Sequence, residues 1–473
     1  MRRRDFLAAA TAALGLPSRA AAQRGYQLVQ YREYARCLPD YLRRLAAEAY
    51  QRRNQALDEL TTPEAIQARQ AWVRQTFWRL VGGRPEPSPL NVRTTGEFSR
   101  PGYRVEKLIY ESQPGLYIAA NLYVPTSASP PFPGVLFQMG HSLNGKAAAL
   151  YQYCCQGLAK LGFLVLAFDP MGQGERTYYP QKDGVLTRLP SADDEHTLPG
   201  KQLLLAGDTS TRMQTWDAVR SLDVLAAHPL ADSKRLAYTG NSGGGTLTMM
   251  LAAVDDRLAA AAACCPNTEN LAWLNFNPPG STDDAEQNFL YSGPQGFDRW
   301  DLLYPLVPKP LLITVSARDF FGTYSPSYLE NGRQEYFRLH AVYRTLAQPG
   351  AVAWYESPLP HGMNYDTRLR VYNWFRRWLQ NGLQPLEREP DVKAEDDRVL
   401  WATDTGNVTR SLGGLTPWKL ARRHAESIRT PERPAELERI LDVDPPAAPQ
   451  PHVVSRAASR ACDAYALEAQ VTP

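Results

Sequence analysis

The 473-residue chain has few cysteines, little net charge and no long hydrophobic segment. None of its six cysteines has the spacing of metal ligands, so we expect no metal and no cofactor. Its 52 basic and 49 acidic residues leave a formal net charge of +3. This argues against nucleic acid as a partner, because nucleic acid requires clustered lysine and arginine. Stable membrane insertion is not expected either, because no segment offers the roughly 20 apolar residues of a spanning helix.

The first residues, MRRRDFLAAATAALGLPSRAAAQ, run from basic to apolar to small, which is typical of a signal peptide. Arg3 and Arg4, followed by Asp-Phe-Leu, resemble a twin-arginine export signal. Cleavage is expected after Ala22, so residues 1–22 are predicted to be removed. The mature protein is therefore predicted to be periplasmic or secreted.

Residues 23–95 are predicted to form a helical arm. Apolar residues recur at helical spacing over residues 39–60 and again over residues 63–81. A proline-rich connector, RPEPSPLN, then separates this arm from the rest of the chain.

Residues at both ends mark the limits of the second predicted helix. Thr61 with Glu64 resembles a capping box, and Pro63 suits a first helical turn. Gly82 and Gly83 are expected to stop the helix.

Residues 96–385 are predicted to form the catalytic domain, around a mostly parallel sheet with helices on both faces. It opens with YRVEKLIYES and GLYIAANLYVP, which predict a hairpin or two edge strands. Continuous apolar runs, typical of strands buried on both faces, follow at residues 134–139, 163–169, 235–240, 258–265 and 311–317. Helical stretches alternate with them at residues 147–160, 211–228 and 246–254, and a last helix ends near residue 383. Residues 386–473 are predicted to be a C-terminal extension, in part loosely ordered, because their apolar pattern is sparse.

The sequence Gly-Asn-Ser-Gly-Gly, residues 240–244, lies between a predicted buried strand and a predicted helix. That context is required for a nucleophile elbow, a tight turn that presents a serine hydroxyl at a helix N-terminus. Ser242 is therefore the candidate nucleophile. As a bare pattern GxSxG occurs often by chance, and a structural glycine-rich turn is the alternative interpretation.

A serine hydroxyl needs a base, and the base in turn needs an orienting carboxylate. In this kind of fold both follow the nucleophile along the chain. His361 lies in a loop after the predicted strand AVAWYES, and Asp319 directly follows the strand LLITVSA. Asp284 is the alternative acid. The remaining histidines lie on helices or in loops outside this order: His196, His228, His340, His424 and His452.

Acyl transfer also requires donors for the oxyanion. The backbone amide of Gly243 follows the nucleophile and supplies one donor. The second is expected from His141 or Ser142, which follow the strand GVLFQM. The His141 side chain itself can simply pack at the strand end, because the backbone role does not require an imidazole.

The chain resembles the bacterial α/β-hydrolases known as acetyl xylan esterase-like or dienelactone hydrolase-like proteins, which are related to the prolyl oligopeptidase superfamily. The similar segments extend over about residues 70–410 and include GHSLNGKA, FDPMGQGER, WDAVRSLDVLAAHP, TGNSGGGT and PHGMNYDTRLRVYNWFRRWL. The resemblance implies an α/β-hydrolase fold with Ser242, Asp319 and His361 as the catalytic triad. It also implies that the loop from Asp169 to Arg176 lies near the mouth of the site. Glucuronoyl esterases, a related group, carry an arginine in the elbow that GNSGGG lacks, which argues against that activity.

We therefore predict a serine carboxylic-ester hydrolase that acts on short acyl esters, such as acetyl esters of carbohydrates, with a small-molecule or oligosaccharide ester as its substrate. A peptidase of the prolyl oligopeptidase type is one alternative, since the same triad cleaves amides. Against it, the sequence shows no repeated segments of the kind that build a propeller. A binding protein on a hydrolase fold is the other alternative, although such a protein is expected to lose one triad member. The sequence leaves the acyl group, the alcohol and the oligomeric state open.

Overall fold

The computed structural model describes residues 34–182, 185–270, 284–320, 327–427, 452–458 and 463–468. The predicted signal peptide lies outside the described residues. The chain divides into two compact units, and Tyr41–Ile428 forms the larger one. Met1–Asp40 and Arg429–Pro473 belong to the smaller unit, in which β10 (His452–Ala458) and β11 (Asp463–Glu468) pair antiparallel. Among the described helices, none has both the length and the apolar character needed to cross a bilayer.

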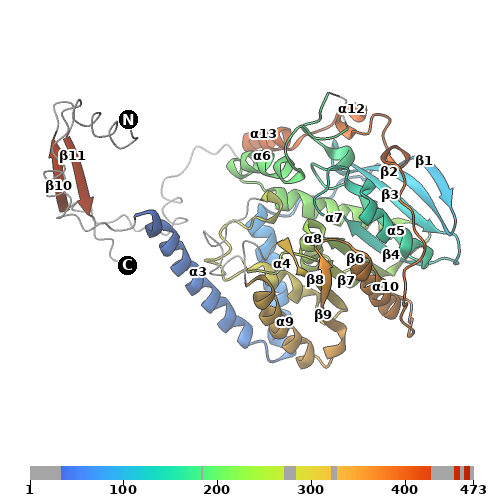
Figure 1. Ribbon diagram of the computed structural model, residues 1–473, viewed down its shortest axis with the longest axis horizontal. Helices are drawn as coiled ribbons and strands as arrows, with labels where there is room; N and C mark the ends of the chain where they lie inside the picture. Colours follow the sequence, from blue (N-terminus) through green and yellow to red (C-terminus); the bar gives the residue numbers. More distant parts are fainter. Residues whose placement is uncertain are drawn as a thin grey trace, which may run out of the picture. The chain divides into compact units, whose positions relative to one another are not determined.

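The larger unit is built on a nine-stranded sheet in the order β1-β2-β3-β5-β4-β6-β7-β8-β9 (Figure 1). The first three strands and β5 pair antiparallel, and all pairs from β5 to β9 are parallel. The strands are β1 (Arg93–Arg100), β2 (Tyr103–Gln113), β3 (Leu116–Pro125), β4 (Phe132–Gln138), β5 (Leu164–Phe168), β6 (Ala231–Asn241), β7 (Leu258–Cys264), β8 (Leu311–Arg318) and β9 (Val352–Pro360). The predicted mostly parallel sheet is thus confirmed. The predicted hairpin is formed by β2 and β3, but β1, which was not predicted, is the edge strand next to it.

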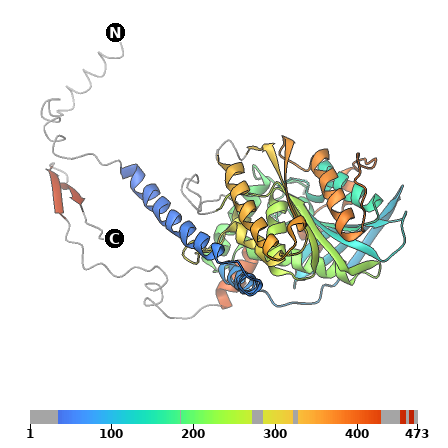
Figure 2. The same cartoon turned by 90° about the horizontal axis from the view of Figure 1, so that it is seen from below.

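Helices cover both faces of this sheet (Figure 2). The described helices are α3 (Tyr34–Asp58), α4 (Pro63–Val81), α5 (Ala149–Lys160), α6 (Ala192–Leu205), α7 (Ser210–Ala227), α8 (Gly243–Val254), α9 (Tyr328–Thr345), α10 (Tyr365–Leu379), α11 (Asp397–Leu400), α12 (Val408–Leu412) and α13 (Pro417–Ser427). Short 3₁₀ turns include η2 (Gly174–Arg176), η3 (Ala285–Gln287) and η4 (Arg299–Leu306).

Alternation along the strands sorts their side chains into two cores. Leu136 of β4 packs in the core under α4, α7, α8 and α9, whereas Val135 and Phe137 pack in the core under α5 and α10. Successive side chains of a strand point to opposite faces, so a strand covered on both faces must be apolar throughout. This explains why the central strands read as continuous apolar runs.

The two helices of the predicted arm are present as α3 and α4. The N-cap of α4 is Thr62, whose side chain accepts a hydrogen bond from the amide of Ala65 at 3.2 Å. The predicted cap at Thr61 was wrong, because a helix that begins at Pro63 is capped by the residue just before it. Gly82 ends the helix in the left-handed conformation with φ 104°, as predicted.

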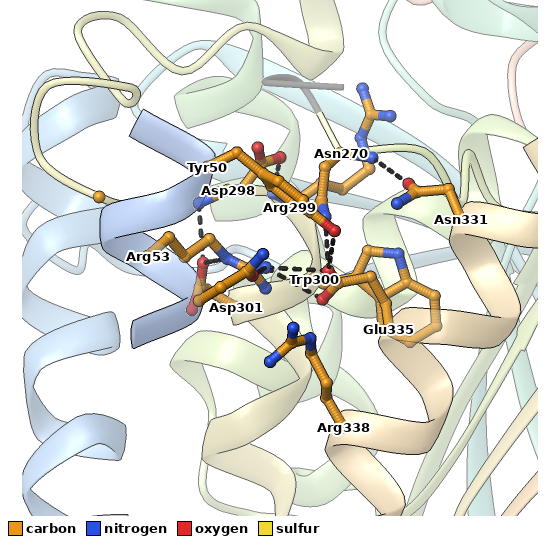
Figure 3. A network of polar contacts seen from close by, with 12 residues as sticks. Tyr50, Arg53, Asn270, Asp298, Arg299, Trp300, Asp301, Asn331, Glu335 and Arg338 are labelled. Atoms are coloured by element: carbon orange, nitrogen blue, oxygen red, sulfur yellow. Dashed lines mark hydrogen bonds and ion pairs between the residues drawn. The ribbon is translucent and has the colours of Figure 1, made fainter. Parts of the chain in front are cut away.

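A buried ion network fixes this arm to the rest of the larger unit (Figure 3). Arg53 of α3 donates to Asp301 at 2.7 Å and to Glu335 of α9 at 3.0 Å, and all three side chains are buried. Tyr50 and Asn270 add hydrogen bonds to Glu335 at 3.0 and 2.8 Å. Buried charges are tolerated only when they are paired and hydrogen-bonded, so each partner depends on the others.

The segment after α10 packs back onto the larger unit. Glu395 accepts two hydrogen bonds from Arg100 of β1, at 2.6 and 2.7 Å. The carbonyl of Leu400 accepts from the buried Asn121 at 3.0 Å, and the amides of Ala402 and Thr403 donate to the buried Glu175. The boundary at residue 385 stays a prediction, but the residues just beyond it satisfy buried polar groups of the sheet and its loops.

We expect Arg53→Ala to destabilise the larger unit by about 3–5 kcal/mol, because it leaves the buried carboxylates of Asp301 and Glu335 without their shared partner. The measurement is the free energy of unfolding from urea titration. Arg338→Ala is the control, since Arg338 also joins α9 to α3 through an ion pair with Asp58, but that pair is exposed and worth at most about 1 kcal/mol. Equal losses in the two variants would contradict this account.

Candidate functional site

Ser242 occupies a strained turn between β6 and α8. Its backbone has φ 59° and ψ −122°, a conformation that non-glycine residues rarely adopt. The Ser242 amide donates to the carbonyl of Cys264 at 2.9 Å, and its carbonyl accepts from the amide of Thr246 at 3.0 Å. Both ends of the serine backbone are therefore held, one by the neighbouring strand and one by the helix that follows.

The glycines around Ser242 are required by close backbone contacts. A Cβ at Gly240 or at Gly244 would come closer than 3.0 Å to the carbonyl oxygen of Gln138 at the end of β4. A Cβ at Gly245 would come equally close to the carbonyl of Cys264 at the end of β7. The turn thus fits between two neighbouring strands only because these positions lack side chains.

His361 and Asp319 meet at the carboxyl ends of β9 and β8. These strands are parallel neighbours, and their last paired residues are Arg318 and Pro360. His361 Nδ1 lies 2.7 Å from Asp319 Oδ2. The Asp319 side chain is 1% exposed and that of His361 is 14% exposed. The geometry suits a carboxylate that orients an imidazole whose other nitrogen faces away from it.

Cys265 lies beside this pair and was missed by sequence reasoning. Its sulfur lies within 4.8 Å of ligand atoms of Asp319 and His361, and its backbone has a positive φ of 43°. The carbonyl of the preceding residue, Cys264, accepts a hydrogen bond from the Ser242 amide. The segment of Cys264 and Cys265 therefore lies between the serine turn and the pair of His361 and Asp319. Burial raises the pKa of the Cys265 thiol to about 12, so the thiol stays protonated at neutral pH.

A second polar cluster lies next to the serine turn. His141 Nε2 lies 3.2 Å from Asp284 and 3.6 Å from Glu286, and His196 Nδ1 lies 3.3 Å from Asp284. Burial disfavours the charged form of His141, but the carboxylates of Asp284 and Glu286 outweigh it and raise the pKa of His141 well above its usual value. Burial, reinforced by Asp284, raises the pKa of Glu286 to about 7. Asp284, the alternative acid, therefore contacts His141 and His196, whereas Asp319 contacts His361.

This second cluster touches the backbone of Gly243. A Cβ on Gly243 would come closer than 3.0 Å to Glu286 Oε1 and would lie 3.0 Å from His141 Cε1. The predicted oxyanion donor thus lies against two members of the cluster. Sequence reasoning had assigned no role to His196 or Glu286.

Of the two candidate amides for the second oxyanion donor, one already has a hydrogen-bond acceptor. The amide of Ser142 donates to the side chain of Gln173 at 2.5 Å, so this amide is already engaged. His141 therefore remains the candidate for the second backbone donor.

Buried charges fix the loop that carries His141. Lys146 Nζ donates to Asp169 at 2.6 Å and to Glu175 at 2.5 Å, and the Lys146 amide donates to Asp169 at 2.7 Å. Asp169 and Glu175 belong to the loop FDPMGQGER after β5. The loops after β4 and β5 are therefore joined by buried ion pairs and hydrogen bonds.

The chain is similar to a known protein family. Residues 90–272 match the family model of the acetyl xylan esterases. The predicted resemblance to these ester hydrolases is thus confirmed over a range that includes Ser242, Gly243 and His141. Asp319 and His361 follow the matched range. No curated protein matches the chain.

Solved structures share the fold. A methylesterase is 19% identical, with a TM-score of 0.58 over 80% of this chain and 81% of its own. A putative acetyl xylan esterase from Bacteroides fragilis is 14% identical, with a TM-score of 0.50 over 72% of this chain and 84% of its own. At these identities the likeness concerns the fold, and it confirms the predicted α/β-hydrolase architecture.

We expect Gly244→Ala to destabilise the protein by about 1–3 kcal/mol and to displace the Ser242 turn, because the added methyl group meets the backbone of Gln138. Urea unfolding measures the first effect and esterase turnover the second. Gly350→Ala is the matched control, since its Cβ would meet no atom within 4 Å. A Gly244→Ala variant as stable and active as the control would show that the contact with Gln138 is unimportant.

Proposed function

We propose that this protein is a serine carboxylic-ester hydrolase that works through an acyl-enzyme, with Ser242 as nucleophile, His361 as base and Asp319 as the residue that orients the base. The observation that carries the proposal is the strained backbone of Ser242 at the junction of β6 and α8, the position that a nucleophile elbow requires. The 2.7 Å contact between His361 and Asp319 at the ends of neighbouring strands supports it.

In the acylation step, Ser242 Oγ attacks the ester carbonyl while His361 Nε2 takes its proton. His361 then gives that proton to the departing alcohol. In deacylation the same imidazole activates water, which releases the acid and restores the serine. Asp319 holds the Nδ1–H tautomer throughout, so that Nε2 faces the reacting atoms.

The negative charge that develops on the carbonyl oxygen needs backbone donors. We assign these to the amides of Gly243 and His141, which follow β6 and β4 on adjacent strands. Gly243 begins α8, so its amide belongs to the first turn of the helix and carries part of the helix dipole.

We propose short acyl esters of carbohydrates, such as acetyl esters, as the substrate class. The match to the acetyl xylan esterase model over residues 90–272 supports this choice. Export through the twin-arginine-type signal at the N-terminus would deliver the enzyme outside the cytoplasm, where polysaccharide fragments are found. Amide cleavage by the same triad is the alternative for the bond cleaved, and the assay below separates the two.

We expect the purified protein to hydrolyse nitrophenyl acetate and acetylated xylan faster than longer acyl esters, a methyl glucuronate ester or a proline anilide. Ser242→Ala should abolish covalent labelling by a fluorophosphonate and leave only residual hydrolysis. Asp319→Asn should lower kcat by a factor on the order of 10⁴, because the imidazole then adopts the wrong tautomer.

Asp366→Asn provides the matched control. Asp366 is a partly buried carboxylate near His361 in sequence, but it accepts hydrogen bonds from Tyr355 and Ser357. This variant should keep most of the turnover. If Asp319→Asn stays within about tenfold of the wild type while Asp284→Asn loses turnover, the acid is misassigned. Full esterase activity in Ser242→Ala would end the serine-hydrolase proposal.

A further inference from the structure

We propose that His141, His196, Asp284 and Glu286 form a binding site for a divalent transition metal of the zinc type, beside the serine turn. One ligand atom from each residue lies within 4.8 Å of all the others. This inference goes beyond the proposed ester hydrolysis, which requires no metal.

The distances from each histidine nitrogen to its neighbours are close to those between the ligand atoms of a tetrahedral metal site. His141 Nε2 lies 3.1 Å from His196 Nδ1, 3.2 Å from Asp284 Oδ2 and 3.6 Å from Glu286 Oε1. His196 Nδ1 lies 3.3 Å from the other oxygen of Asp284, Oδ1, and 3.5 Å from the other oxygen of Glu286, Oε2. Zinc bound tetrahedrally by nitrogen and oxygen, at its usual bond lengths, separates its ligand atoms by about 3.3–3.5 Å.

The orientation of His196 is the one that metal ligands adopt. Its Nε2 lies 2.7 Å from the carbonyl oxygen of Met171. A carbonyl only accepts hydrogen bonds, so Nε2 carries a proton, and in the neutral ring Nδ1 directs a lone pair into the cluster. A second ring nitrogen bonded to a backbone carbonyl is typical of histidine ligands, because it fixes the ring and its tautomer.

The carboxylates are positioned in the same way. Gln214 donates to Glu286 Oε2 at 2.9 Å, and Gln287 donates to Asp284 Oδ2 at 3.0 Å. These amide side chains fix the orientation of the two carboxylate groups.

Glu286 Oε1 points into the cluster without a hydrogen-bond donor among the described residues. The Glu286 side chain is 1% exposed. His141 Nε2, at 3.6 Å, is too far for a hydrogen bond, so this buried carboxylate oxygen is left without one. Such an oxygen is costly to bury, and a bound cation removes that cost.

Protonated histidines alone satisfy this cluster poorly. His141 Nε2 faces Asp193, Asp284, Glu286 and His196 Nδ1, all at 3.0–3.6 Å. A single N–H at this nitrogen cannot bond to so many atoms in different directions. A cation at the centre contacts each ligand with a separate bond, and its two positive charges balance Asp284 and Glu286.

The site is open to solvent on one side and touches the serine turn on the other. The Asp193 side chain, 3.0 Å from His141 Nε2, is 55% exposed and marks a route by which a metal can enter. Toward the turn, His141 and Glu286 lie against Gly243. A bound metal would therefore join the loop after β4, α6 and η3 next to the proposed oxyanion donor.

The test measures metal content directly and does not depend on activity. The untagged full chain is stripped with a chelator, dialysed against micromolar Zn²⁺ and analysed by elemental mass spectrometry. We expect about one Zn²⁺ per chain, and Co²⁺ in its place should give the strong visible absorption of a tetrahedral site. Zn²⁺ should also raise the unfolding temperature of the stripped protein.

Two variants and two controls locate the site. Glu286→Gln and His196→Gln each remove a ligand atom and should weaken Zn²⁺ binding at least about tenfold, since even residues outside the ligand shell change affinity by about 10–100-fold. Ser242→Ala and Asp319→Asn should bind Zn²⁺ like the wild type, which separates this site from the proposed catalytic triad. Zinc content in the wild type no higher than in the dialysis buffer would overturn the proposal. Binding that neither ligand variant weakens would overturn it as well.

Discussion

The close approach of three strand ends around residues 240–245 is the constraint on which the rest of the site depends. The turn that carries Ser242 lies directly on the last carbonyls of β4 and β7. No side chain fits in that space, so the turn needs glycine at these positions. With glycine there, the turn fits between the carboxyl ends of the parallel strands, where the site lies. Everything proposed for catalysis follows from this contact, because it fixes where the serine, the helix N-terminus and the loop after β4 lie.

Much of the architecture could be predicted because it depends on local pattern. Strands covered on both faces must be apolar throughout, and β4, β5, β6, β7 and β8 all lie where the apolar runs predicted them. The contact between Asp319 and His361 also followed from order along the chain. Parallel neighbouring strands end at the same edge of a sheet, so residues that follow them are brought together.

The features that were missed depend on contacts between distant segments. Strand β1 has the sequence RTTGEFSR, which carries no apolar pattern, and none of its residues is buried. Its pairing with β2, which the sequence does not reveal, defines it as a strand. The cluster around His141 and His196 joins residues from three separate loops and helices. Single histidines and carboxylates carry no pattern that shows which of them will meet. The packing of the segment around Thr403 could not be predicted for the same reason. Its amides donate hydrogen bonds to Glu175, which lies far away in sequence.

The pairing of Arg53 with Asp301 and Glu335 has a consequence for the order in which the chain is synthesised. Arg53 leaves the ribosome early, and its partners follow 248 and 282 residues later. Until these partners emerge, the Arg53 side chain stays hydrated and pays no desolvation free energy. The helix that carries it lacks the carboxylates of Asp301 and Glu335, with which Arg53 pairs in the folded protein. The arm can therefore take its final place only after most of the sheet has been made. If this helix packed early onto an unfinished sheet, it would bury the Arg53 charge without a partner, which is costly. The charge therefore delays docking of the arm until Asp301 and Glu335 are in place.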